Sequence, residues 1–152
     1  LYNHSKVKVH VSFTKGEGFG RPLLEASVSG KPVVASGWSG HLDFLDKDGA
    51  LLVGGELKNV HESSAWENVL MKEASWFAPD PQQAVNAMAA AFLNYSEFKN
   101  RAYDTADKNR KRFSYDAIQK KTWELLDKYV PEFPKEVALV LPKLKKVERK
   151  VN

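Results

Sequence analysis

The chain contains no cysteine, and this absence excludes several kinds of chemistry. Without a thiol there is no disulfide framework, no cysteine nucleophile and no cysteine-ligated metal site. The four histidines, His4, His10, His41 and His61, are scattered, and no two have the spacing that puts two metal ligands on one helix. We therefore expect no metal site. The lack of cysteine also fits a reducing compartment, so we expect a cytoplasmic protein.

Long apolar runs and a leader sequence are lacking as well. No stretch of eighteen or more apolar residues is present, and a membrane-spanning helix needs about that length. The segment Leu1 to Lys6 lacks the basic and then apolar pattern of a signal peptide. There is no initiator methionine, and we expect the chain to be a fragment whose first strands precede Leu1.

A net charge of +4 raises the question of nucleic-acid binding, and the distribution of the charge argues against it. Much of the excess lies in Lys108–Lys121 and Lys143–Lys150. In the first segment the lysines and arginines lie among periodic apolar residues, as on the solvent-exposed face of an amphipathic helix. The second has no aromatic residues on which bases could stack. We expect no nucleic-acid partner and an extended basic tail at 131–152, either solvated or in weak contact with an acidic partner or an anionic membrane.

The chain is long enough for one domain with a buried core, which we expect to span residues 1–130. Its first two thirds alternate between β-rich runs and helical patterns, which predicts strands at Val7–Phe13, Lys31–Ser36 and Gly49–Gly54, and a helix at Arg21–Ser29. This order is typical of an α/β fold, and we expect a partial, Rossmann-like parallel sheet flanked by helices. The first two strands should pair in parallel.

The last third is predicted to be helical. The expected helices are Pro81–Asn94, Glu97–Arg112 and Tyr115–Tyr129. Three of the four tryptophans are expected in the core: Trp66, Trp76 and Trp123. Trp38 is different because it lies among glycines, and it can either stack on a base or a sugar or cover the sheet.

The segment from Ser12 to Leu45 contains the clearest candidate for a ligand-binding site. A glycine-rich loop precedes the helix at Arg21–Ser29, and two glutamates flank the start of that helix, Glu17 in the loop and Glu25 inside the helix. Glycines let a backbone approach a ligand closely, and a helix N-terminus favours phosphate. Carboxylates suit vicinal hydroxyls. The pattern predicts a phosphorylated, hydroxyl-rich ligand, and the alternative is a simple turn with Glu25 favourable to the helix dipole.

Several segments resemble the family-four retaining glycosyltransferases, which have the two-domain GT-B fold. The similarity is carried by Glu17-Gly18-Phe19-Gly20, Leu23-Leu24-Glu25-Ala26 and the strand Lys31–Ser36, and it continues in Gly40–Leu45, Gly49–Val53 and Trp76–Asp80. It covers about Val7 to Tyr129. The resemblance is to the C-terminal, donor-binding domain, and it implies half of a GT-B architecture.

The resemblance implies an enzyme that transfers a sugar from a nucleotide-diphosphate sugar, of the UDP or GDP type, to an acceptor with retention and without a cofactor. Glu17 would be catalytic and would bind the donor sugar together with the backbone of Gly18, Phe19 and Gly20. Arg21 and Pro22 would approach the diphosphate, and Glu25 would hold the nucleotide ribose. Arg21 departs from the family, which usually has an aliphatic residue there, so its side chain reaches either phosphate or solvent.

The family's basic pair for the leaving group and its N-terminal acceptor domain would both precede Leu1. The chain alone is therefore expected to be inactive. A different class of function remains as the alternative, in which the chain is a non-catalytic Rossmann-like module for binding or assembly.

Overall fold

The structure, a computed structural model, describes residues 1–131. The chain divides into two compact units, Leu1–Ile118 and a second that begins at Gln119. Apart from Pro131, the basic tail expected at 131–152 lies outside the described residues. No helix within the described range is long and apolar enough to cross a membrane.

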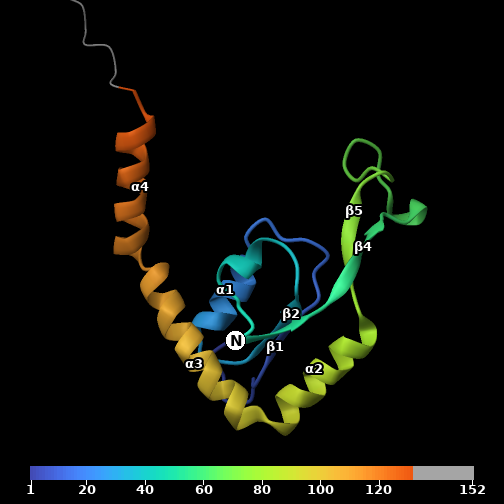
Figure 1. Cartoon of the computed structure of the whole chain (residues 1–152), viewed down its shortest axis with the longest axis horizontal. Helices are drawn as coiled ribbons and strands as arrows, with labels where there is room; N and C mark the ends of the chain where they lie inside the picture. The colour runs from blue at the N-terminus through green and yellow to red at the C-terminus, as the bar shows by residue number, and fades with distance from the viewer. Residues whose placement is uncertain (132–152) are drawn as a thin grey trace, which may run out of the picture. The chain divides into compact units, whose positions relative to one another are not determined.

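A three-stranded parallel sheet forms the centre of the first unit (Figure 1). Strand β1 (His10–Ser12) pairs in parallel with β2 (Val33–Ser36), and β2 pairs in parallel with β3 (Ala50–Val53), so the order is β1-β2-β3. The α/β fold class and the parallel pairing of the first two strands are thus confirmed. Each strand is shorter than predicted, because the paired ladder stops before the ends of the predicted segments.

Strand β2 is buried throughout, as its uninterrupted apolar run predicts for an inner parallel strand. Its side chains alternate between two core clusters. Val33 and Ala35 pack on the side of α1 (Arg21–Val28), while Val34 packs on the side of α2 (Pro81–Leu93). The two helices therefore cover opposite faces of the sheet.

Local sequence signals fix the ends of the first two helices. Pro22 lies in the first turn of α1, and Gly30 follows its end with φ of 73°, a left-handed conformation that favours glycine. The Asp80 carboxylate caps α2 by accepting a hydrogen bond of 2.7 Å from the Gln83 amide. Helices α3 (Tyr95–Arg112) and α4 (Tyr115–Tyr129) complete the helical last third that the sequence predicted.

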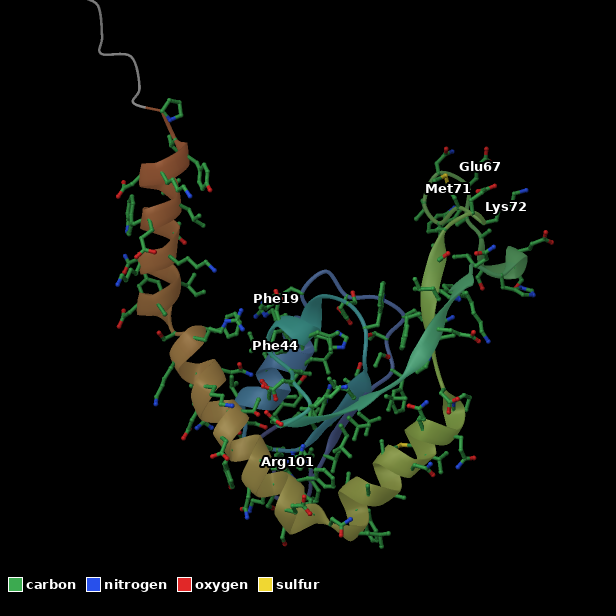
Figure 2. The ribbon with its side chains drawn as sticks, in the orientation of Figure 1. Phe19, Phe44, Glu67, Met71, Lys72 and Arg101 are labelled. Carbon is green, nitrogen blue, oxygen red and sulfur yellow. The ribbon has the colours of Figure 1, made fainter. Side chains whose placement is uncertain are left out.

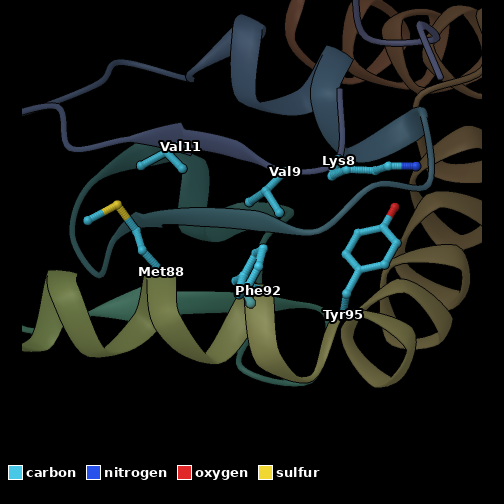
Figure 3. Close-up of a pocket in the computed structure, with 7 residues that line it drawn as sticks. Lys8, Val9, Val11, Met88, Phe92 and Tyr95 are labelled. Carbon is cyan, nitrogen blue, oxygen red and sulfur yellow. The ribbon is translucent and has the colours of Figure 1, made fainter. Parts of the chain in front are cut away.

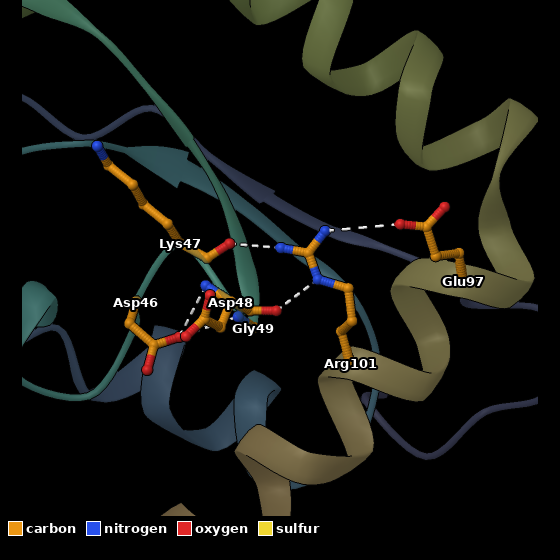
Figure 4. Close-up of polar contacts among 6 residues, drawn as sticks. All are labelled: Asp46, Lys47, Asp48, Gly49, Glu97 and Arg101. Atoms are coloured by element: carbon orange, nitrogen blue, oxygen red, sulfur yellow. Dashed lines mark hydrogen bonds and ion pairs between the residues drawn. The ribbon is translucent and has the colours of Figure 1, made fainter.

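Arg101 of α3 fixes the turn that leads into β3 (Figure 4). Its guanidinium donates hydrogen bonds to the carbonyl oxygens of Asp48, at 2.5 Å, and of Lys47. Within the turn, the Asp46 carboxylate accepts a hydrogen bond of 2.9 Å from the Gly49 amide. Helix α3 thus holds the entry to β3 through backbone acceptors.

Buried Asn109, also on α3, joins this helix to two other parts of the core. Its side-chain amide donates to the Ser27 hydroxyl of α1 at 3.0 Å and to the Phe44 carbonyl at 3.1 Å. Both hydrogens of this buried amide are bonded. A different packing of α3 would leave its buried partners without these hydrogen bonds, so the amide adds specificity to the packing.

An antiparallel hairpin is the element that the sequence interpretation missed. Strand β4 (Gly55–Asn59) pairs with β5 (Ser75–Pro79) as a separate two-stranded sheet. Every residue of β4 is exposed, so the strand lacks the alternation of apolar and polar residues that marks a half-buried strand. The connection at 60–74 is also much longer than the two to five residues of most hairpin loops.

The expectation that three tryptophans lie in the core is wrong for two of them. Trp66, in the connection between β4 and β5, is 69% exposed, and Trp123, on α4, is 58% exposed. Trp76 is partly buried on β5, with the Lys15 ammonium 3.2 Å from its ring centre.

Candidate functional site

Two loops meet at the edge of the sheet where the parallel strands β1 and β2 end. The loop at residues 13–20 joins β1 to α1 and contains Glu17, and the turn at 37–39 follows β2. Because the carboxyl ends of parallel strands lie at one edge, both segments leave the sheet at the same place. Open α/β sheets usually bind their ligands at this edge.

Ser39 and Gly40 hold the Glu17 loop through its backbone. The Glu17 amide donates to the Ser39 hydroxyl at 2.8 Å, and this hydroxyl donates to the Glu17 carbonyl at 2.6 Å. The Gly40 amide donates to the same carbonyl at 3.0 Å. A Cβ on Gly40 would overlap the Gly18 carbonyl oxygen, so only glycine allows the two backbones to approach this closely.

The backbone of Ser39 adopts an unusual conformation. Its φ of 89° and ψ of −169° fall in a region that residues with a Cβ rarely occupy. Such strain costs on the order of 1–3 kcal/mol and persists only where surrounding contacts hold it in place. Here the hydrogen bonds to Glu17 hold it, so the geometry of this turn and that of the Glu17 loop depend on each other.

The Glu17 side chain is half-buried, and its carboxylate forms no hydrogen bond or ion pair with any residue of 1–131. The next residue, Gly18, is exposed, and a Cβ added to it would meet nothing within 4 Å. The fold itself therefore needs neither a carboxylate at 17 nor a glycine at 18. Both would serve a ligand that accepts a close backbone approach and offers hydroxyl groups.

Arg21 and Glu25 form an ion pair one helical turn apart on α1. The Arg21 Nε lies 2.8 Å from the Glu25 carboxylate, and the two side chains are 84% and 47% exposed. An exposed pair of this kind is worth only about 0.3–0.5 kcal/mol. A ligand can therefore separate the two charges at little cost. Neither side chain is tied to the protein by any other hydrogen bond within residues 1–131.

The Phe19 ring packs against other aromatic rings although 41% of the residue stays exposed. It contacts Phe44, with ring centres 5.1 Å apart (Figure 2), and Phe113, at 5.7 Å. Gly20 is buried with φ of 84°, and a Cβ there would lie 2.9 Å from that of His41. The contacts of the Phe19 ring thus anchor the loop at the start of α1.

His41 is a residue of the site that sequence reasoning left without a role. It is fully buried, and its Nε2 lies 2.7 Å from the Ser36 carbonyl oxygen, to which it donates. Its Nδ1 has no hydrogen-bond partner among the described residues. A signal was present in the sequence, because Ser39, Gly40 and His41 directly follow a buried strand at the same edge as the Glu17 loop. Residues 1–131 contain no cluster of three or more His, Asp or Glu side chains that could hold a metal ion.

An apolar groove of about 420 Å³ lies along β1 and α2 (Figure 3). Its lining includes Lys8, Val9, Val11, Met88, Phe92 and Tyr95. None of the predicted site residues lines this groove, so it is separate from the Glu17 loop.

The structure thus brings the predicted residues from Glu17 to Glu25 onto one loop and the helix that follows it. It also adds Ser39 and Gly40, which hold the loop, and buried His41, which is bonded to the Ser36 carbonyl at the end of β2. Any functional assignment rests on this arrangement and on the motif residues, because comparisons of the chain with models of protein families, with curated proteins and with solved structures find no match.

Proposed function

We propose that the segment Ser12–Leu45 binds a nucleotide-diphosphate sugar, of the UDP or GDP type, as the donor of a retaining glycosyltransferase. The chain would be the donor-binding half of a GT-B enzyme that needs an N-terminal acceptor domain for activity. A cytoplasmic location belongs to the same proposal. The observation that supports it best is the Glu17 carboxylate, which is half-buried in a rigid glycine loop and forms no bond with the described protein.

In this proposal Glu17 accepts hydrogen bonds from hydroxyls of the donor sugar. Its second task arises when the leaving group departs and the anomeric carbon gains positive charge. A fixed carboxylate near that charge stabilises the transition state more than the ground state. The loop is suited to this role because its backbone is already held by Ser39 and Gly40 and needs no rearrangement.

The start of α1 would receive the diphosphate. The N-terminus of a helix carries a partial positive charge, which favours phosphate. The Leu23 and Leu24 amides donate to the Gly20 carbonyl and Pro22 has no N–H, so the Arg21 amide is the one that a ligand would use. No side chain caps α1, and Arg21 and Pro22 at its first positions are exposed. Arg21 would leave Glu25 to contact the phosphates, and Glu25 would then accept hydrogen bonds from the ribose hydroxyls. The observed ion pair would thus be exchanged for two ligand contacts.

The experiment compares Glu17→Gln and Glu25→Gln in the 152-residue chain. Binding of UDP, GDP and ADP is followed by ligand-observed NMR, together with UDP-glucose and GDP-mannose. We expect millimolar binding, a free energy of only about −4 kcal/mol, because one wall of the cleft is missing. Glu25→Gln should weaken every nucleotide by on the order of 1–3 kcal/mol, since charge-assisted bonds to the ribose are lost.

Glu17→Gln should leave free UDP and GDP unchanged and weaken only the sugar nucleotides. Glu124→Gln is the matched control, because it breaks an exposed ion pair of the same spacing, Lys120–Glu124, in the second unit. If no nucleotide bound to the folded chain, the non-catalytic module would be favoured. If Glu17→Gln abolished binding of the free nucleotides, our division of roles between the two glutamates would be wrong.

A further inference from the structure

Trp38 presents an open aromatic surface beside the Glu17 loop. Its ring stacks on that of Phe77 in β5, with ring centres 6.0 Å apart and planes 9° apart. Phe77 is buried, while Trp38 remains 42% exposed. The contact with Phe77 thus leaves part of Trp38 accessible to a ligand.

The position of this ring is fixed by the backbone on both of its sides. The Gly37 amide donates to the Val53 carbonyl at 2.7 Å, and Ser39 is bonded to Glu17 in its strained conformation. The ring under Trp38 is tied to the same loop, because the Phe77 amide donates to the Lys15 carbonyl at 2.9 Å. The indole, its support and the Glu17 loop therefore form one rigid assembly.

Holding a large aromatic ring open in this way carries a free-energy cost. A buried tryptophan contributes a large hydrophobic stabilisation, and the chain forgoes part of it at Trp38. It does so in a turn whose next residue, Ser39, is itself strained. Strained backbone residues cluster at active sites and ligand clamps, and aromatic side chains are common in the lining of ligand sites. A flat apolar face is the natural partner, either of a sugar ring or of a nucleobase.

Two observations favour the sugar ring. Trp38 directly precedes Ser39, which contacts Glu17, so it lies at the Glu17 end of the site rather than beside Glu25 on α1. A base also needs hydrogen bonds at its edge, and polar groups of the two residues that flank Trp38 are already used. The Ser39 hydroxyl is bonded twice to Glu17, and the Gly37 amide is bonded to Val53.

We propose that Trp38 is a stacking platform for a pyranose ring, with the Glu17 carboxylate binding hydroxyl groups of the same saccharide. This inference rests on the proposed function and names the contact that orients the sugar. The apolar C–H face of a pyranose lies flat on an aromatic ring, while its hydroxyls project from the ring edge toward acceptors such as a carboxylate. The saccharide is either the donor sugar or the acceptor, and both present the same chemistry.

The test is a saturation-transfer NMR experiment on the full chain with selective irradiation of aromatic protons. UDP-glucose and GDP-mannose form the donor arm. Methyl glucoside and methyl mannoside, added together with UDP or GDP, form the acceptor arm. We expect transfer to the ring C–H protons of the sugar in at least one arm. Trp38→Ala should weaken that saccharide about tenfold and leave free UDP and GDP unchanged. Trp38→Phe should restore part of the binding, and Trp66→Ala, which removes an exposed tryptophan in the β4–β5 connection, should have no effect.

The proposal is overturned if no saccharide receives transfer in the wild-type chain, or if Trp38→Ala binds it as tightly as the wild type does. If Trp38→Ala does not fold, the test uses NMR contacts between indole protons and sugar protons in the wild-type chain. Contacts that are lost in Trp38→Phe are assigned to Trp38, and their absence from the wild type overturns the proposal. The two proposals fail separately. If UDP and GDP do not bind but a saccharide does bind at Trp38, the nucleotide-sugar function is refuted. If the nucleotides bind and Trp38→Ala does not change saccharide binding, only the stacking role of Trp38 is refuted.

Discussion

Replacing Gly40 with alanine should displace the Glu17 loop. A Cβ at this position would overlap the Gly18 carbonyl oxygen and would lie 2.7 Å from the Gly18 carbonyl carbon and 2.9 Å from the Glu17 oxygen. Ordinary contact begins near 3.4 Å, so the Gly18 carbonyl carbon must retreat by about 0.7 Å and the overlapping oxygen by more. The neighbours are backbone atoms, which cannot move away by a change of rotamer.

The retreat has an energetic and a functional consequence. It strains the three hydrogen bonds that the Glu17 backbone makes with Ser39 and Gly40. We expect the free energy of unfolding to fall by about 1–3 kcal/mol, the usual cost of inserting a methyl group into packed structure. Ligand affinity should fall as well, because the carboxylate of Glu17 no longer lies where the turn had placed it.

Two other glycines of the same loop are matched controls. A Cβ at Gly16 or Gly18 would meet nothing within 4 Å, so both alanine variants should keep the wild-type stability within about 0.5 kcal/mol. Gly18→Ala should nevertheless weaken nucleotide-sugar binding, because the ligand approaches its backbone, whereas Gly16→Ala should not. Urea unfolding and ligand-observed NMR measure both effects. A Gly40→Ala variant as stable as Gly16→Ala, with unchanged ligand binding, would refute the reasoning.

Two further predictions concern stability. Asn109→Leu should lower the free energy of unfolding by about 2–3 kcal/mol, because it leaves the buried Phe44 carbonyl without its bond from Asn109. Asn100→Leu on the exposed side of the same helix should change it by less than about 0.5 kcal/mol in the same urea titration, and equal losses would contradict the assignment. Burial lowers the pKa of His10 from its usual 6.5, so the folded state binds this proton less tightly than the unfolded state does. The stability that neutral His10 contributes is therefore fully present above about pH 6.5 and is lost as the pH falls through the lowered pKa. His10→Gln should make the urea midpoint depend less on pH between about 7 and 5, and an unchanged pH dependence in His10→Gln would count against the mechanism.

The parallel sheet and the helices could be predicted because each carries a local signal. The apolar run of β2 indicates a strand buried on both faces, and Pro22 and Gly30 mark the two ends of α1. The sequence also predicted a glycine loop that leads into α1, and the structure places Glu17 on this loop and Glu25 on the helix. All of these signals lie within a few residues of the element that they predict.

The β4–β5 hairpin and the inner structure of the site could not be predicted in this way. Strand β4 is fully exposed, so no burial pattern marks it. The pairing of Arg21 with Glu25 was not expected either, although their spacing of four residues permits it. The bonds from Ser39 to Glu17 join residues 22 positions apart, and only the sheet brings them together. The stacking of Trp38 on Phe77 depends on the hairpin that the sequence interpretation missed.

The central claim is that the start of α1, directly after the Glu17 loop, binds a nucleotide diphosphate. A titration of the isotope-labelled chain with UDP, GDP and ADP, observed through its backbone amides, tests it most directly. The account predicts that shifts concentrate on the amides of Arg21 and Glu25 for at least one nucleotide. An absence of shifts with all three, in a folded sample, would contradict it. So would shifts confined to the apolar groove along β1 and α2, around Val11 and Met88.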